Sequence, residues 1–322
     1  MFVVTGAAGF VGYNFVKFLN KQEIHDIIII DTLQHGKKWK KLTDLKFHEY
    51  LDYREGPMAL KEALDRYSIK GIFHIGANAD VLCNDNTLML DQNYEQTKFY
   101  FFYCQSNKIP FIYASTSAVY GNSAACIPLN EYEKPHNIYA MSKLMFDNFL
   151  RSSFSLGLAN EKVVGLRLFN VFGSGEEHKG PNSSLPKRFF DFTIEKQYID
   201  VFSAEISRDY VFVEDVCEVF WHAYTQEIPS GIYNLGSGVT ISHMEIAQVT
   251  RNCAIKHGFE CAASENFITK INMPESLVGA FQFYTKAQDV PSWISNIVIN
   301  SLEKIERYSD HLFYRHRNGE KL

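Results

Sequence analysis

A tyrosine and a lysine one helical turn apart are the residues of this chain best placed for acid/base chemistry. Tyr139 and Lys143 fall in the stretch Tyr139-Ala140-Met141-Ser142-Lys143, and a helix would present both side chains on one face. A phenol has a pKa of about 10, and a fixed cation beside it favours the phenolate and lowers that pKa. The pair predicts a general base tuned by a lysine. An ordinary pair on a helix surface is the alternative.

Hydroxyl side chains follow a predicted strand upstream of this pair. The apolar run from Ile109 to Tyr113 predicts a strand that leads through Ala114 into Ser115-Thr116-Ser117. In a parallel sheet, ligands bind beyond the carboxyl ends of the strands, where these hydroxyls emerge. They are candidates for orienting a reacting oxygen, and an ordinary Ser/Thr turn is the alternative.

A glycine-rich turn near the start of the chain predicts a dinucleotide site. Gly6, Gly9 and Gly12 lie between the apolar run Met1 to Val4 and the helical stretch Tyr13 to Asn20. Gly6 permits a tight turn, Gly9 lets backbone N–H groups approach a pyrophosphate, and Gly12 lets the helix pack closely on the sheet. The diphosphate would then lie at the N-terminus of the helix.

An acidic residue ends the second predicted strand. The run from Asp26 to Ile30 is rich in isoleucine, as expected for a parallel strand buried on both faces, and Asp31 follows it. A dinucleotide fold places its acceptor for ribose hydroxyls about 20 residues beyond the glycines. This context favours a cofactor role for Asp31 over that of a residue capping a turn.

The elements that must position these residues alternate between strand and helix. Gly71 to Ile75 and Lys162 to Val171 predict further strands, and Asn93 to Ser106 predicts a helix. Another helix follows Pro135, and on it Asp147 continues the face of the tyrosine and lysine, which we expect to reach a ligand. The alternation predicts an α/β fold, a Rossmann doubly wound parallel sheet.

The regular alternation ends near the middle of the chain. We predict a dinucleotide-binding Rossmann domain over residues 1–172 and a smaller, mainly substrate-binding α/β region over residues 173–322. Parts of residues 208–240, Tyr210 to Val216 and Ile232 to Leu235, are expected to complete the main sheet. The 6 cysteines contain no Cys-x-x-Cys pair, so neither a zinc site nor a disulfide framework is indicated, and no metal is expected.

Composition limits the partners. The 322 residues are 46% hydrophobic and can bury a large core, and a formal net charge of -5 gives no electrostatic footprint for nucleic acid. No apolar run approaches the roughly 20 residues of a membrane span, and Met1 opens directly into the first strand without a signal peptide. We expect no nucleic-acid or membrane partner and a cytoplasmic location.

In their order along the chain, the glycine turn, the hydroxyl cluster and the Tyr-x-x-x-Lys pair resemble the extended short-chain dehydrogenase/reductase superfamily, and specifically its nucleotide-sugar epimerases and dehydratases. The resemblance covers nearly the whole chain. It implies a catalytic triad of Thr116, Tyr139 and Lys143, in which the hydroxyl orders the substrate oxygen, the tyrosine exchanges its proton and the lysine holds the cofactor. It also implies hydride transfer from the sugar to a nicotinamide and back with inverted configuration.

Three further stretches resemble the ADP-L-glycero-D-manno-heptose 6-epimerases: Tyr132 to Pro135, Leu168 to Gly173, and Glu177-His178-Lys179-Gly180. This resemblance implies that Lys179 is a second acid/base on the opposite side of the substrate. Without the resemblance, Lys179 reads as a solvated lysine in a polar loop. The implied substrate is ADP-heptose, the implied setting is lipopolysaccharide biosynthesis, and the implied assembly is a homo-oligomer.

The heptose epimerases generally use NADP. Lys38 matches a lysine of that family, whereas Asp31 would repel a 2′-phosphate, so NADP is favoured and NAD is the alternative. The residues expected at the cofactor by resemblance are Gly6, Gly9, Phe10, Val11, Gly12, Asp31, Thr32, Lys38, Ile75, Gly76, Ala77, Asn93, Tyr139 and Lys143.

An arginine is expected to hold the substrate diphosphate. Arg208 matches the family's arginine at this place, and a bidentate guanidinium suits the task. A surface pair with Asp209 is the alternative. The residues expected at the substrate by resemblance are Asn170, Val171, Lys179, Arg188, Phe202, Arg208 and Phe281.

The chain departs from the heptose epimerases at several places. Asn78 to Cys83 replaces a hydroxyl-rich segment, and Tyr53 and Phe281 replace a cofactor lysine and a substrate tyrosine. Another nucleotide-sugar epimerase, for example one acting at C4, therefore stays open. A 4,6-dehydratase is disfavoured, because Ser117-Ala118 stands where that subfamily has Asp-Glu. The non-enzyme alternative is a dinucleotide-binding regulator, against which the complete triad argues.

Overall fold

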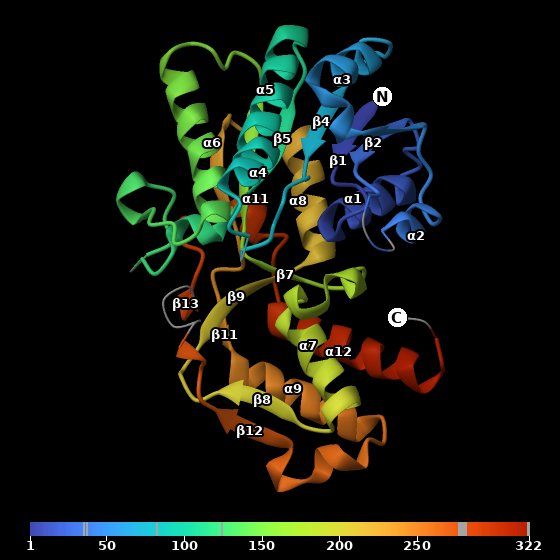
Figure 1. Cartoon of the computed structure of the whole chain (residues 1–322). Helices are drawn as coiled ribbons and strands as arrows, with labels where there is room; N and C mark the ends of the chain where they lie inside the picture. Colours follow the sequence, from blue (N-terminus) through green and yellow to red (C-terminus); the bar gives the residue numbers. More distant parts are fainter. Residues whose placement is uncertain (35, 37, 82, 124, 276–281, 321–322) are drawn as a thin grey trace.

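A parallel sheet forms the centre of the molecule in this computed structural model, which describes residues 1–322 except 35, 37, 82, 124, 276–281 and 321–322. Its strand order is β10-β6-β5-β4-β1-β2-β3, and every neighbouring pair is parallel (Figure 1). The predicted doubly wound α/β fold is therefore confirmed. The strands are β1 (Phe2–Thr5), β2 (Ile27–Asp31), β3 (Glu49–Asp52), β4 (Gly71–His74), β5 (Phe111–Thr116), β6 (Val163–Leu168) and β10 (Gly231–Leu235).

Helices cover both faces of this sheet. On one face lie α1 (Phe10–Lys21) and α8 (Val213–Thr225), and on the other lie α3 (Gly56–Leu64), α5 (Gln96–Asn107) and α6 (Ile138–Ser155). Strand β2 shows the consequence, because Ile27 and Ile29 pack with the first pair of helices while Ile28 and Ile30 pack with the second set. Alternate side chains of a strand point to opposite faces, which explains the apolar run in the sequence.

The helix predicted from Asn93 is longer than expected. It begins with α4 (Asn86–Leu90), whose N-cap Asp85 accepts a hydrogen bond from the N–H of Leu88, and a π-helical turn at Asp91–Glu95 joins α4 to α5. Such π-turns are frequent at functional sites. Here the turn carries Asn93, which is fully buried.

The strand predicted from Lys162 to Val171 is in fact two strands in two sheets, so that prediction is wrong. After β6, Phe169 donates its N–H to the carbonyl of Leu235 at 3.1 Å, and the chain then enters β7 (Asn170–Phe172). Strand β7 pairs with β9 (Ser207–Phe212) in a small sheet that also contains β11 (Thr240–Ser242) and β13 (Tyr284–Thr285). The run is mostly apolar on both sides of Phe169, and its pattern carries no sign of where the chain leaves the main sheet.

The two segments expected to rejoin the main sheet differ. Ile232 to Leu235 lies in β10 at the edge of the main sheet, next to β6. Tyr210 to Val216 does not return, because its first residues lie in β9 and Val213 begins α8. A short apolar run followed by a helical pattern fits either environment, and tertiary packing decides between them.

The rest of the chain forms a smaller body at the carboxyl edge of the main sheet (Figure 1). It contains α7 (Leu185–Lys196), α9 (His243–Lys256) and α12 (Ser301–Arg317), together with a two-stranded sheet of β8 (Ile199–Phe202) and β12 (Ile268–Ile271). The remaining short helices include α2 (Trp39–Leu42) and α11 (Ser292–Ser295). In the described part of the chain, we find no helix with the length and apolar character needed to span a membrane.

Candidate active site

The glycine turn packs directly against the loop that follows β4. Gly6 has a φ of +71°, and a Cβ on it would lie 2.6 Å from the Cα of Gly76. A Cβ on Gly12 would lie 2.1 Å from the carbonyl oxygen of Gly6, so α1 can approach the turn only without a side chain there. Gly9 is the N-cap of α1, and it has no side chain that could accept hydrogen bonds from the first turn of the helix. The backbone N–H groups of that turn are therefore available to bind an anion. Phe10 and Val11 open that first turn.

Asp31 ties the end of β2 to this turn. Its carboxylate accepts the N–H of Ala8 and the N–H of Thr32, each at 2.7 Å, and the Nζ of Lys38 lies 3.9 Å from the Oδ1 atom. Burial raises the pKa of Asp31, although Lys38 and the two N–H groups act in the opposite direction. The sequence prediction of an acidic group beside the glycine turn agrees with this geometry.

A buried histidine that the sequence reading overlooked links the same loops. The ring of His74 contacts the Thr5 hydroxyl through Nδ1 at 2.8 Å and the Thr97 hydroxyl through Nε2 at 2.9 Å. Thr97 donates its proton to the carbonyl of Asn93 at 2.6 Å, so it accepts from Nε2–H. Thr5 accepts the N–H of Gly76 and therefore donates to Nδ1. The sequence feature that could have indicated this histidine is its polar ring within the otherwise apolar run Gly71 to Ile75.

His74 is held in its neutral form. Burial lowers its pKa well below the ordinary value, and the charge of Lys143 adds to that effect. The ring therefore fixes the turn after β1 to the segment after β4, where Ile75, Gly76 and Ala77 were expected to contact the cofactor.

Asn93 has protein partners on every side. Its Oδ1 accepts the N–H of Asn78 at 2.7 Å, and its Nδ2 donates to the carbonyl of Asn78 at 2.9 Å and to the hydroxyl of Ser142 at 3.1 Å. Ser142 lies on α6 between Tyr139 and Lys143. Asn93 thus holds the loop after β4 against the helix of the triad, whereas the resemblance implied direct cofactor contact.

The predicted triad comes together at the carboxyl end of β5. Thr116 is the last residue of β5, and its hydroxyl oxygen accepts the N–H of Ala118 at 3.1 Å. The phenol of Tyr139 is hydrogen bonded to the Thr116 side chain. From the next turn of α6, the Nζ of Lys143 donates to the carbonyl of Ala114 at 2.8 Å.

The protonation of this triad differs from the simple expectation. Burial raises the pKa of Tyr139, and its hydrogen bond with Thr116 offsets only part of that change. Burial also lowers the pKa of Lys143 to about 8, with the charge of Asp147 acting in the opposite direction. The predicted lowering of the Tyr139 pKa by Lys143 is not seen in this structure, because desolvation of the phenol outweighs other influences. Tyr139 is a neutral phenol at pH 7.

Lys179 lies over the start of α1. Its Nζ is 5.0 Å from the centre of the Phe10 ring and 3.9 Å from a carboxylate oxygen of Glu176, and burial lowers its pKa. Glu176 is itself fully buried and accepts hydrogen bonds from the Ser184 backbone and side chain and from the Tyr308 hydroxyl. Lys179 thus contacts the protein near the start of α1, at the diphosphate end of the predicted cofactor site.

A second lysine, outside the sequence predictions, ties this loop to α2. The Nζ of Lys41 donates to the carbonyl of Gly175 and to Nδ1 of His178, the latter at 2.8 Å. Burial lowers the pKa of Lys41 to about 8 and, together with nearby lysines, lowers the pKa of His178 to about 4. His178 is therefore a neutral acceptor. No sequence signal marks this contact, because it joins residues far apart in the chain.

Basic side chains gather where the smaller body meets the small sheet. Arg208 donates through Nε and Nη2 to the carbonyl of Gln282 at 3.1 and 2.7 Å. Burial and the charge of Arg188 lower its pKa. Burial, Arg208 and Arg188 together lower the pKa of His243 to about 3. The sequence reading anticipated the two arginines but not His243.

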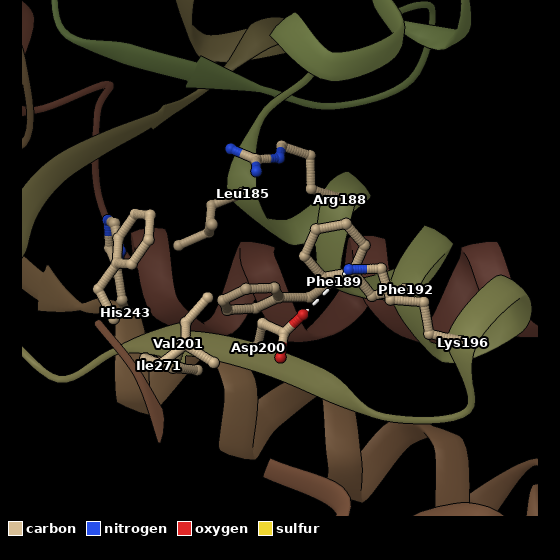
Figure 2. Close-up of a pocket in the computed structure, with 10 residues that line it drawn as sticks. Leu185, Arg188, Phe189, Phe192, Lys196, Asp200, Val201, His243 and Ile271 are labelled. Atoms are coloured by element: carbon tan, nitrogen blue, oxygen red, sulfur yellow. Dashed lines mark hydrogen bonds and ion pairs between the residues drawn. The ribbon is translucent and has the colours of Figure 1, made fainter. Parts of the chain in front are cut away.

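An apolar cavity of about 150 Å³ adjoins these basic groups. Figure 2 shows its aromatic and aliphatic side chains between α7 and β8, with Arg188 above them and the ion pair of Lys196 and Asp200 at one side. The lining consists of Leu185, Arg188, Phe189, Phe192, Lys196, Asp200, Val201, Phe202, His243 and Ile271.

Asn170 and Val171, which were also expected at the substrate, are not among the residues that line this cavity. Asn170 donates to the carbonyl of Asp209 at 2.8 Å and so joins β7 to β9, where Val171 pairs with Val211. Phe281 lies outside the described residues. Among the residues that the structure does describe, no group of His, Cys, Asp and Glu side chains is arranged to hold a metal ion.

Comparisons with known proteins agree with this arrangement. The sequence model of the NAD dependent epimerase/dehydratase family matches residues 2–236. The ADP-L-glycero-D-manno-heptose-6-epimerase of Brachyspira hyodysenteriae is 36% identical over 291 residues, which cover 89% of each chain.

Solved structures show the same fold. The ADP-L-glycero-D-manno-heptose-6-epimerase of Helicobacter pylori has a TM-score of 0.80 at 26% identity, covering 97% of this chain and 95% of that one. A UDP-N-acetylglucosamine 4-epimerase from Methanobrevibacter ruminantium has a TM-score of 0.79 at 22% identity, covering 99% and 98% of the two chains. At that identity the second likeness concerns the fold alone.

Proposed function

The chain belongs to the NAD dependent epimerase/dehydratase family and is a nucleotide-sugar epimerase, and from this premise we propose that it inverts C6 of ADP-glycero-manno-heptose. The observation that carries the proposal is the meeting of Thr116, Tyr139 and Lys143 at the end of β5. The likeness to the Brachyspira enzyme over most of both chains supports the choice of sugar.

The residues present fit a nicotinamide dinucleotide. Gly6, Gly12 and Gly76 let the turn after β1, the start of α1 and the loop after β4 pack backbone against backbone, because a Cβ at any of them would meet a neighbouring segment. Asp31 stands at the end of β2, where a dinucleotide fold binds ribose hydroxyls. When bound, the cofactor would accept a hydride from the sugar and return it to the opposite face.

The triad supplies the proton transfers. Thr116 orients the reacting oxygen by a hydrogen bond. Tyr139 first releases its own proton to solvent, and as a phenolate it then takes up the hydroxyl proton and later returns it. Lys143 stabilises the phenolate in that step and holds the cofactor ribose. We propose Lys179 as the second acid/base from its match to the heptose epimerases, and this role requires its side chain to turn from Glu176 toward the sugar. Burial lowers its pKa, which favours the neutral amine that a base needs.

The basic groups beside the apolar cavity suit a nucleoside diphosphate. We propose that Arg188 and Arg208 bind the diphosphate and that the cavity takes the base between aromatic rings such as Phe192 and Phe202. Guanidinium groups bind such oxyanions through paired hydrogen bonds.

We propose NADP as the cofactor. Lys38 lies 3.9 Å from the carboxylate of Asp31, so a cation stands beside the expected ribose acceptor and offsets its repulsion of a 2′-phosphate. Replacing Lys38 with Ala should weaken NADP binding about tenfold or more, the loss of a charge-assisted hydrogen bond, and leave NAD binding nearly unchanged. Calorimetry with both dinucleotides measures this, and equal or tighter binding of NAD by the wild-type protein would overturn the choice.

The substrate is tested by incubation with ADP-heptose and with a panel of other ADP-sugars, UDP-sugars and GDP-sugars, followed by NMR. We expect inversion at C6 of ADP-heptose alone. No product from ADP-heptose rejects the heptose assignment, and inversion at C4 of a UDP-sugar would replace it. We further propose that the protein is cytoplasmic, forms a homo-oligomer and acts in lipopolysaccharide biosynthesis. Light scattering measures the size of the assembly and so tests the proposed homo-oligomer.

A further inference from the structure

A buried carboxylate continues the catalytic face of α6. Asp147 lies one turn beyond Lys143, which itself lies one turn beyond Tyr139, and Asp147 is 0% exposed. Side chains four residues apart on a helix are neighbours. The carboxylate is therefore near enough to act on the charge of Lys143. It is buried and does not line a solvent-facing ligand site, as its place on that face had suggested.

The carboxylate is anchored to the strand that carries Thr116. Its Oδ1 accepts the hydroxyl of Tyr113 at 2.8 Å, and its Oδ2 accepts the hydroxyl of Ser115 and the Nε of Arg167, each at 2.9 Å. Tyr113 and Ser115 lie on β5, and Arg167 lies on the neighbouring β6. Asp147 thus joins the helix of the acid/base pair to the strand of the orienting hydroxyl.

The charges around Asp147 are nearly balanced. Arg167, 0% exposed, also donates to Glu133 at 2.6 Å, and Glu133 in turn pairs with Arg151 at 2.6 Å. Once Lys143 is included, this group carries one net positive charge next to Tyr139. A phenolate at Tyr139 would cancel it, so the network favours the charge that forms when Tyr139 loses its proton.

This inference rests on the proposed function: we propose that Asp147 is a positioning residue that keeps Lys143 protonated one helical turn from Tyr139. Tyr113, Ser115 and Arg167 hold its carboxylate in place for that purpose. The role differs from that of a buried ion pair that only stabilises the fold, because it acts through the charge of Lys143.

The titration of Lys143 supports this proposal. Burial lowers the pKa of Lys143 to about 8, and the charge of Asp147 is the influence that raises it. The other groups facing this region are the neutral ring of His74 from β4, Tyr139 on α6, and Arg167 from β6. None of these supplies a negative charge at pH 7, so loss of the Asp147 carboxylate should lower the pKa of Lys143 further.

The test is a pH titration of lysine Nζ in the full-length protein by ¹⁵N NMR, with the Lys143 signal identified through Lys143→Arg. In Asp147→Asn we expect the Lys143 midpoint to fall by about one to three pH units, and the alkaline limb of kcat/KM to fall with it. Glu133→Gln is the matched control, since it removes the other carboxylate on Arg167 and should leave the Lys143 midpoint in place.

An unchanged Lys143 midpoint in Asp147→Asn overturns the proposal. If Asp147→Asn does not fold, the wild-type titration decides, because a midpoint below pH 7 contradicts a lysine kept charged and a midpoint near 8 agrees with it. The Nζ titration needs no sugar substrate, so absence of turnover on ADP-heptose would refute the proposed function without altering this readout.

Discussion

At the scale of single residues, Asp209 shows how a buried charge near the site is satisfied. Asp209 is 0% exposed, and its two carboxylate oxygens accept the N–H groups of Ser237, Gly238 and Ala287. Burying a carboxylate is costly unless such hydrogen bonds replace water. Because Asp209 follows Arg208 in β9, this network fixes the strand that carries the arginine.

Removal of one hydroxyl tests the chemistry at Tyr139. We expect Tyr139→Phe to reduce turnover at least about a hundredfold, because the general acid/base is lost while the ring remains. The assay is epimer formation at saturating ADP-heptose. Tyr314→Phe, at a side chain 53% exposed on α12, is the matched control and should keep full activity. Near-normal turnover of Tyr139→Phe would contradict the assignment.

Replacement of His74 tests the hydrogen-bonded link between the loops. In His74→Leu the hydroxyl of Thr5 loses its acceptor in a buried site, and we expect a loss of about 1–3 kcal/mol in the free energy of unfolding. Urea denaturation measures the change. Thr97→Val removes the acceptor of the Nε2–H together with the hydrogen bond of Thr97 to the Asn93 carbonyl, and should also destabilise the protein. A stability equal to that of the wild type would show that the link contributes nothing.

At the scale of elements, the fit between α1 and the glycine turn depends on the absence of one side chain. Gly12→Ala should improve the helical propensity of α1 by about 1 kcal/mol, yet its Cβ would meet the Gly6 carbonyl oxygen at 2.1 Å. We expect a net destabilisation of about 1–3 kcal/mol from overpacking and a marked loss of dinucleotide affinity. Thermal unfolding and calorimetry measure the two effects. A more stable variant with normal affinity would refute the close contact.

The first turn of α9 carries a histidine that is sensitive to acid. His243 is the first residue of α9, and its pKa of about 3 lies below the ordinary 6.5. Below pH 6.5 the unfolded chain binds a proton that the folded chain does not, so stability falls as the pH falls. Between pH 6.5 and pH 5 we expect a loss of about 2 kcal/mol from this residue.

Comparison with His243→Gln isolates that contribution. Urea denaturation at pH 7 and pH 5 gives, for each protein, the change in the free energy of unfolding between the two pH values. That change should be larger for the wild type than for the variant by about 2 kcal/mol. Other titrating groups are common to both proteins and cancel. Equal differences would show that His243 accepts its proton as readily when folded as when unfolded.

Elements defined by local patterns could be predicted from the sequence, and those defined by partners could not. The path from Gly6 through α1 to Asp31 follows from glycines, an apolar run and one acidic residue at a fixed distance. The departure of the chain at Phe169 depends on its bond to Leu235, which is remote in sequence. Asp147 was placed correctly on its helix face, but its buried partner Arg167 on β6 was not visible from α6 alone.

At the scale of the whole molecule, the main sheet draws on both halves of the chain. Strand β10 forms its edge, and α8 covers one face with Val216, Val219 and Phe220 among its buried side chains. The amide of Asn234 in β10 further accepts the Tyr120 hydroxyl at 2.6 Å and donates to the carbonyl of Cys126 at 2.7 Å. A division near Phe172 therefore cuts through the core of the main sheet, although the residues from Phe172 onward also form a hydrophobic cluster of their own in the smaller body.

A fragment of residues 1–172 tests that conclusion. It would lack α8, which exposes the face of the sheet around Phe2 and Phe73, where Trp221 and Tyr224 now pack. Without β10, the apolar strand β6 would also become an open edge that invites aggregation. We expect no cooperative urea transition by circular dichroism, whereas the full chain unfolds cooperatively. A stable monomeric fragment that binds the dinucleotide would instead establish residues 1–172 as an independent domain, with β10 and α8 as accessories to it.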